Sequence, residues 1–283
     1  MSGSPFAGGV LRDGGAAGAS LTAGGVPDGG DDAVEATMRS LLPEAAAFAR
    51  APVSGFRVGA VARGASGALY AGANLELAGM PLGCSVHAEQ AAVANARRHG
   101  ERRILAFAVT AAPCGHCRQF LHELADPSAI RILVREGEPR TLGALLPEAF
   151  APRDLGIATD PLDGAAVALV LDAPPADPLV DVARSSAERA YAPYSGTRAG
   201  VALRARDGAM YGGASLESAA YNPSLPPLQD ALVALLFAGK RLDEIEACAL
   251  VETPGAISHR AHAEALLRAL GVADLGYARA SLR

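Results

Sequence analysis

The chain has no tryptophan, and aromatic residues make up only 5% of its 283 positions. Half of the residues are hydrophobic, and alanine supplies much of that share, so we expect a compact protein with small core side chains. Basic runs are also missing, and the formal net charge is −5 at pH 7. Because no basic surface would neutralise phosphates, the sequence argues against a nucleic-acid polymer as a partner.

Long apolar runs are absent too, and no stretch approaches the roughly 20 residues that span a bilayer. Residues 1–32 are rich in glycine and lack the charged and apolar regions of a secretory signal. We therefore expect a disordered tail, no membrane partner and a cytoplasmic protein. Two of the four cysteines form a Cys-x-x-Cys pair, which indicates metal or redox chemistry in a reducing compartment. The four are Cys84, Cys114, Cys117 and Cys248.

The chain contains an internal repeat. The segment from Ala51 to Glu76 matches the segment from Ala192 to Glu217 at a constant offset. The order of the matches indicates a tandem duplication. Two further blocks match in the same order, the first after a two-residue deletion: 85–90 with 224–229, and 109–114 with 250–255.

Both copies have the same pattern of expected elements. Apolar spacing predicts helices over 33–50 and 179–192, and each is followed by a hairpin. Alternating strands and helices predict three-layer α/β/α units of the α/β class. The other expected elements are hairpins of Val58–Ala62 with Ala68–Ala71 and of 199–205 with 209–214, helices His87–Arg98 and Cys114–Ala125, and strands Ile104–Thr110, Ile130–Val134 and Val167–Leu171.

The most informative residues are His87-Ala-Glu89 and the later Pro113-Cys114-Gly-His-Cys117. His87, Cys114 and Cys117 offer three ligands and leave one tetrahedral position for water, as in a catalytic zinc centre. Zinc lowers the pKa of bound water, and a nearby carboxylate moves protons, so Glu89 is the candidate acid and base. An expected helix start at Cys114 would stabilise its thiolate.

From about residue 33 to the end, the sequence resembles the long, two-copy, homodimeric zinc-dependent cytidine deaminases. The resemblance implies a duplicated cytidine deaminase-like fold with a catalytic domain over 33–155, a linker over 156–178 and a degenerate domain over 179–283. The matching segments are Phe56-Arg-Val-Gly-Ala, Gly72-Ala-Asn74-Leu-Glu76, Val86-His87-Ala-Glu89-Gln90, Pro113-Cys114-Gly-His-Cys117-Arg-Gln-Phe and Asn222-Pro-Ser-Leu-Pro-Pro-Leu-Gln229.

The resemblance implies hydrolysis of cytidine and deoxycytidine to the uridine nucleosides and ammonia, in pyrimidine salvage. One zinc ion per chain would be held by His87, Cys114 and Cys117. Glu89 would pass one proton from water to N3 of the base and another to the departing ammonia.

The resemblance also assigns a substrate pocket. Asn74 and Glu76 would hold the ribose hydroxyls, and the Glu76 charge would repel a phosphate, which favours a nucleoside. Phe56 would pack on the pyrimidine ring. Ala88 and Ala112 would complete the pocket, although many relatives have a hydroxyl residue where this chain has Ala112.

The second copy lacks these catalytic residues. The positions that match the histidine, the glutamate and the two cysteines of the first copy hold Pro226, Leu228, Gly255 and Ser258. This set of side chains cannot hold zinc. Residues 215–221 nevertheless resemble a segment of short, four-subunit deaminases that reaches into a neighbouring site. This implies a homodimer in which Ala219 and Tyr221 line the partner's pocket.

Three alternatives remain open at this stage. Cys84-x-x-His87 with Cys114-x-x-Cys117 has the spacing of a structural Cys₃His zinc site, which would leave Glu89 without a role. A redox Cys-x-x-Cys is the second alternative, although it does not require a His-x-Glu motif. The third is a zinc deaminase of another heteroaromatic amine.

Several single residues also have two interpretations. His116 is either a fourth ligand or packs locally, and Phe56 is either a base-stacking or a core aromatic. Arg118 either donates to a zinc thiolate or pairs on the surface. We expect Cys84 to be a small buried or half-buried residue that does not bind the metal, and Cys248 to be a core residue. The remaining histidines are expected to be exposed or hydrogen-bonded: His99, His122, His259 and His262.

Overall fold

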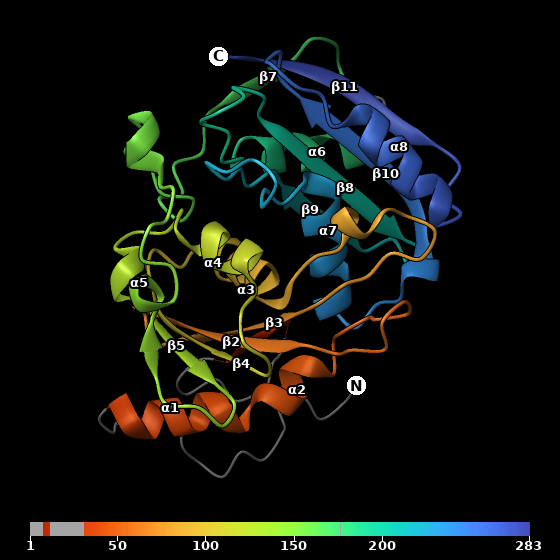
Figure 1. Ribbon diagram of the computed structural model, residues 1–283. Coiled ribbons are helices and arrows are strands. Elements are labelled where there is room, and N and C mark those ends of the chain that lie inside the picture. Colours follow the sequence, from red (N-terminus) through yellow and green to blue (C-terminus); the bar gives the residue numbers. More distant parts are fainter. Residues whose placement is uncertain (1–7, 12–30, 176) are drawn as a thin grey trace. The chain divides into compact units, whose positions relative to one another are not determined.

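The computed structural model describes residues 8–11, 31–175 and 177–283, which form two compact units (Figure 1). The first unit comprises Met1–Leu77 and Ser85–Asp163, and the second comprises Ala78–Cys84 and Gly164–Arg283. Most of the expected 1–32 tail lies outside the described residues. Within residues 1–32, Val10–Leu11 form strand β1, and helix α1 begins at Asp31. The expectation of disorder is therefore wrong at these positions.

The first unit contains a six-stranded sheet in the order β1-β3-β2-β4-β5-β6. Strands β4 and β5 are parallel, and the other neighbours are antiparallel. Its remaining strands are β2 (Gly59–Gly64), β3 (Leu69–Ala73), β4 (Ile104–Val109), β5 (Arg131–Val134) and β6 (Arg140–Thr141). Its helices are α1 (Asp31–Ser40), α2 (Leu42–Ala46), α3 (Ala88–Arg98), α4 (Gly115–Leu121) and α5 (Leu142–Leu145).

Helices cover both faces of this sheet (Figure 1). A Cβ atom on Gly59 of β2 would lie 2.6 Å from the α2 backbone, and one on Gly72 of β3 would lie 2.0 Å from the α3 backbone. Gly59 pairs with Ala73, the neighbour of Gly72, so the two glycines face opposite sides of the sheet. The predicted three-layer α/β/α unit is confirmed.

The second unit repeats this arrangement around a five-stranded sheet in the order β7-β11-β10-β8-β9. Gly200 faces α6 and Gly213 faces α7, and they stand where Gly59 and Gly72 stand in the first unit. Its strands are β7 (Leu169–Leu171), β8 (Ala199–Ala205), β9 (Met210–Ala214), β10 (Ile245–Glu252) and β11 (Leu275–Leu282), and its helices are α6 (Pro178–Ala187), α7 (Pro227–Phe237) and α8 (Arg260–Ala269).

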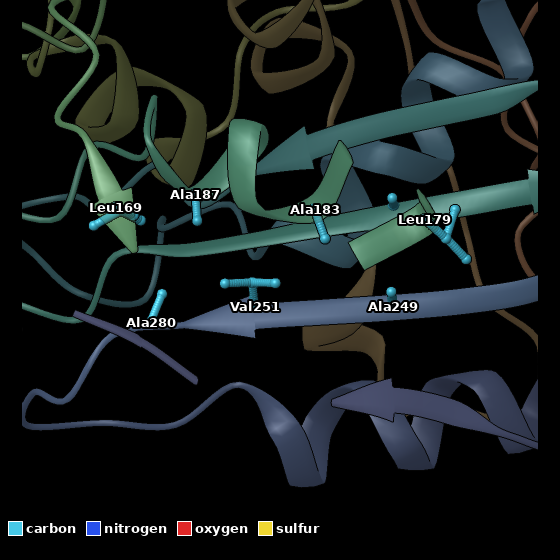
Figure 2. Packing of buried hydrophobic residues seen from close by; sticks show 8 residues of the cluster. Leu169, Leu179, Ala183, Ala187, Ala249, Val251 and Ala280 are labelled. Atoms are coloured by element: carbon cyan, nitrogen blue, oxygen red, sulfur yellow. The ribbon is translucent and has the colours of Figure 1, made fainter. Parts of the chain in front are cut away.

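Small residues dominate the packing of α6 on its sheet (Figure 2). Leu179, Ala183 and Ala187 recur every four residues along α6, and all three are buried against the strands. Their partners are Leu169, Ala202, Ala249, Val251 and Ala280. Short side chains let the helix approach closely, as the alanine-rich composition predicts.

One expected helix is divided in the structure, and one expected strand is present. The expected helix over 33–50 divides into α1 and α2, because Pro43 at the start of α2 cannot donate a backbone hydrogen bond to the preceding turn. Strand β7 lies within the linker expected over 156–178 and pairs with β11, which confirms the strand expected over Val167–Leu171. None of the helices in the described part of the chain combines the length and apolar character of a bilayer crossing.

A buried carboxylate holds the turn between β2 and β3 in the first unit. Glu101 is only 4% exposed and accepts hydrogen bonds from Tyr70, Ser66 and the backbone amides that follow it. A Cβ atom at Gly64 would lie 1.8 Å from its Oε2 atom, so a side chain at this position would displace the carboxylate. Burial raises the pKa of Glu101, but these hydrogen bonds outweigh burial and the pKa is lowered overall.

Replacing Glu101 with glutamine should therefore reduce stability at pH 7, by about 2 kcal/mol, because charged acceptors make the stronger hydrogen bonds. A carboxyl group with a lowered folded pKa stabilises the fold above its unfolded pKa of about 4.3 and loses this effect as the pH falls through the folded pKa. The difference in Tm between wild type and Glu101→Gln should narrow as the pH falls below about 4.3, the ordinary pKa of a glutamate. A constant difference in Tm down to pH 3 would contradict this role.

Candidate metal and substrate site

The candidate metal ligands lie at the starts of two helices in the first unit. His87 immediately precedes α3, and its backbone amide donates to the Gln90 side chain at 3.0 Å. Cys114 immediately precedes α4, and Cys117 lies in the first turn of that helix. The helix therefore begins at Gly115, one residue after the expected start. An extended residue before each helix, followed by a helical turn, brings the three side chains together.

The donor atoms form a tight triangle. Nδ1 of His87 lies 3.5 Å from Sγ of Cys114 and 3.2 Å from Sγ of Cys117, and the two sulfur atoms are 3.6 Å apart. Zinc at its usual distances from sulfur and nitrogen would place tetrahedral ligands about 3.5–3.8 Å apart. The observed separations and the soft-to-borderline donors therefore fit a tetrahedral zinc ion with one position left for a non-protein ligand.

The two thiols are linked by a hydrogen bond. The contact between the two sulfur atoms lowers the pKa of Cys114 to about 4. The same hydrogen bond and burial raise the pKa of Cys117. Zinc binds cysteine as the thiolate, so metal binding must release any proton that these two sulfur atoms carry.

Glu89 lies in the first turn of α3, two residues after His87. It is 4% exposed, and its Oε2 atom accepts a hydrogen bond from Cys117 at 3.2 Å. Burial raises the pKa of Glu89, because the charged form loses solvation. A buried carboxyl group at this distance from a metal ligand can exchange protons with a molecule bound beside the metal.

Asn74 and Glu76 follow β3 and hold the loop that presents Phe56. Asn74 accepts from the Val58 amide at 2.8 Å and donates to the Phe56 carbonyl at 2.9 Å. Glu76 accepts from the amides of residues 53 and 54, each at 2.9 Å. The Phe56 side chain is 61% exposed, so the core-aromatic interpretation is wrong.

A backbone bridge connects this loop cluster to the metal ligands. Leu75, between Asn74 and Glu76, pairs antiparallel with Val86, the residue before His87. The two groups predicted from separate motifs therefore lie side by side in the first unit. Of the two alanines assigned to the pocket, Ala88 is buried and Ala112 is exposed.

The alternative ligands are not part of the donor group. Among the described residues, the group comprises His87, Cys114 and Cys117, and buried Cys84 is not a member, which argues against the Cys₃His site. The ring of His116 stacks on His87 with centroids 4.9 Å apart, so it packs locally. Arg118 has neither expected partner, because it donates to the carbonyls of Pro113 and Leu145, each at 2.8 Å.

The remaining candidates are structural. Cys248 is buried as expected, His262 contacts Gln229 at 2.7 Å, and His99 contacts the Asn95 carbonyl at 2.9 Å. His122 and His259 differ from the expectation. Their Nε2 atoms are buried without a hydrogen-bond partner among the described residues, and burial lowers the pKa of both rings.

Known proteins are similar to this chain over the segments that contain the site. The family model for the cytidine and deoxycytidylate deaminase zinc-binding region matches residues 32–132 and again residues 142–264. The cytidine deaminase of Vibrio vulnificus (strain CMCP6) is 45% identical over 232 residues, which cover 82% of this chain and 78% of that protein. The chain belongs to the cytidine deaminase family. Its metal is zinc.

Two further cytidine deaminases are similar to this chain in sequence. The protein of Sodalis glossinidius is 45% identical over 255 residues, covering 86% of this chain and 82% of the relative. The crystal structure of the Mycobacterium tuberculosis cytidine deaminase is 37% identical and covers 41% of this chain and 96% of that one, with a TM-score of 0.38.

The described residues of the second unit lack the metal donors. The loop that corresponds to the Phe56 loop is buried against residues 255–257. Thr197, which stands where Phe56 stands in the first unit, is fully buried. Its hydroxyl donates to the Ile257 carbonyl at 3.0 Å and accepts from the Ile257 amide at 3.3 Å. A Cβ atom at Gly255 would lie 2.1 Å from that hydroxyl, so the loop packs directly on Thr197. Among its described residues, this unit contains no metal-binding group.

Proposed function

We propose that the protein hydrolyses cytidine and deoxycytidine to uridine and deoxyuridine with release of ammonia, as a step of pyrimidine salvage. One observation carries the proposal: the donor triangle of His87, Cys114 and Cys117 lies against the buried carboxyl group of Glu89. The 45% identity to cytidine deaminases supports the choice of substrate. The catalytic domain is 33–155, and the domain over 179–283 has no catalytic residues of its own.

Zinc bound by the three ligands would supply a hydroxide nucleophile at neutral pH, because it lowers the pKa of water. Glu89 accepts the proton that the attacking water gives up and delivers it to N3 of the pyrimidine. Glu89 then takes the remaining proton from the new hydroxyl on C4 and transfers it to the exocyclic amine as the bond from C4 to nitrogen breaks and the C4 carbonyl forms. Water is consumed and ammonia leaves, so the carboxyl group returns to its starting state. Its raised pKa suits a group that must both accept and donate protons.

The pocket residues orient the nucleoside. Asn74 and Glu76 bind the ribose hydroxyls, and the Glu76 carboxylate disfavours a 5′-phosphate by charge repulsion. The exposed ring of Phe56 packs on the pyrimidine. Ala88 and the backbone carbonyl of Ala112 contact the base and the departing amine.

Deamination assays with product identification test this proposal. We expect the zinc-loaded protein to convert cytidine and deoxycytidine to uridine and deoxyuridine, with one ammonia released per product. Cytidine monophosphate should react much more slowly, because Glu76 repels its charge. Turnover of another heteroaromatic amine with none of cytidine would contradict the substrate assignment and favour a different deaminase.

We further propose a homodimer in which Tyr221 and Ala219 of one chain line the pocket of the other. Tyr221 supports this role, because its side chain is 66% exposed and its φ of 61° is uncommon for a residue other than glycine. Ala219 is buried in its own unit, so the proposal rests mainly on Tyr221. Since Cys114 and Cys117 must stay reduced to bind zinc, we place the reaction in the cytoplasm.

Tyr221→Ala should raise the KM for cytidine and weaken dimerisation, because it removes a large exposed aromatic side chain from the proposed interface. Sedimentation and steady-state kinetics on the same preparation measure both effects. A variant with wild-type association and wild-type KM would show that Tyr221 does not contribute to the partner's pocket.

A further inference from the structure

Ser54 occupies a central position in the loop that presents Phe56. Its hydroxyl donates to the Glu76 carboxylate and accepts from the Phe56 amide at 2.9 Å. Its own amide donates to the same carboxylate at 2.9 Å. One small side chain therefore connects the carboxylate assigned to ribose with the backbone of the aromatic residue assigned to the base.

The rest of the loop depends on these contacts. Phe56 is mostly exposed, so packing does not fix its ring, and its backbone is held on both sides by side chains. Ser54 accepts from its amide, and Asn74 donates to its carbonyl at 2.9 Å. Gly55, between Ser54 and Phe56, has a φ of 69°, a backbone conformation that residues other than glycine rarely adopt.

The charge on Glu76 is also maintained by this arrangement. The hydrogen bond from Ser54 is the largest influence on the Glu76 pKa, which is lowered against a smaller opposing effect of burial. Both carboxylate oxygens have donors within the loop, and Oε1 retains capacity to accept from a ligand hydroxyl. The carboxylate is thus oriented before substrate arrives.

We propose that Ser54 is a positioning residue for nucleoside binding: its hydroxyl orients the Glu76 carboxylate toward the sugar and fixes the loop that carries Phe56. This inference rests on the proposed deaminase function. It assigns Ser54 to the binding of the sugar and base, and the proton transfer remains with Glu89.

The second unit provides a matched control. Ser195 donates its hydroxyl to Glu217, whose carboxylate also accepts from the amides of Tyr194 at 2.9 Å and Ser195 at 3.1 Å. The Thr197 amide donates to the Ser195 hydroxyl at 3.0 Å. The same hydrogen-bonded turn therefore forms in a unit without metal donors. Removal of the Ser195 hydroxyl measures the structural contribution of such a turn alone.

The experiment compares Ser54→Ala, Ser54→Thr and Ser195→Ala with wild type, using cytidine and 2′,3′-dideoxycytidine. We expect Ser54→Ala to raise the KM for cytidine about tenfold or more with kcat changed less than about threefold, since a charge-assisted hydrogen bond is lost from the binding site. Ser54→Thr keeps the hydroxyl and should restore most of the affinity. Ser195→Ala should retain the wild-type KM.

The dideoxynucleoside separates positioning from general damage. Because it lacks the hydroxyls that Glu76 would bind, the KM penalty of Ser54→Ala should be several-fold smaller with this substrate. An unchanged KM in Ser54→Ala, an equal rise in Ser195→Ala, or an equal penalty with both substrates would overturn the role of Ser54. No cytidine turnover by wild type would instead contradict the proposed function itself.

Discussion

Glu89→Gln is expected to lower kcat for cytidine by several orders of magnitude, about 10³–10⁴-fold, while one zinc ion per chain remains bound. Glutamine keeps the size and hydrogen-bonding reach of the side chain but cannot accept and release the protons that the reaction moves. Because Glu89 is not one of the three donors at ligand distance, its replacement should leave metal binding intact. Steady-state kinetics and metal analysis on the same sample measure both properties.

A matched control for Glu89→Gln exists in the second unit. Glu252 is also a buried glutamate, and it accepts hydrogen bonds from Ser258 at 2.6 Å and Tyr277 at 3.1 Å. Glu252→Gln should lower the Tm but leave kcat of the folded protein near the wild-type value. If Glu89→Gln retained more than about a tenth of wild-type kcat, Glu89 would not be the general acid and base.

Cys114→Ala and Cys117→Ala are each expected to abolish tight zinc binding and to lower activity more than about 10³-fold, because two protein ligands do not hold zinc in place. Cys84→Ala is the control. It removes a buried thiol near His87 in sequence, but this thiol is outside the donor group. It should therefore retain zinc and turnover. Metal content after gel filtration, measured with kcat, distinguishes the three variants.

The cysteine series also tests the structural-zinc alternative. If Cys84→Ala lost zinc together with Cys114→Ala and Cys117→Ala, four protein ligands would surround the metal and no position would remain for water. If the cysteine variants kept their activity, the Cys-x-x-Cys pair would have no part in the chemistry. Either result would contradict a catalytic metal held by His87 and these two thiols.

Sequence patterns predicted the metal site because each functional residue lies at a local structural boundary. His87 and Cys114 are the first residues of two predicted helices, and in the structure each lies immediately before its helix. The internal repeat predicted both the tandem units and the loss of metal donors in the second. The two hairpins were also predictable, because each consists of two apolar runs separated by a glycine turn. The parallel strands β4 and β5 were predictable because a segment with helical spacing separates them.

Other features depend on contacts between residues distant in sequence. The pairing of β1 with β3 and the closure of the second unit by Thr197 and Ile257 join segments that no local pattern connects. The role of Ser54 in holding Glu76 is likewise visible only after folding, although the same Ser-Gly dipeptide occurs in both copies. Pro43 marks the division between α1 and α2, but the apolar periodicity on either side of it favoured one continuous helix.

Zinc titration of the metal-free protein, with cytidine turnover measured at each addition, tests the central claim most directly. Only the first unit contains a donor triangle among the described residues, so we predict that activity rises in proportion to added zinc and stops rising at one ion per chain. Full activity without zinc, or a rise that continues to two ions per chain, would contradict a deaminase with a single catalytic metal site.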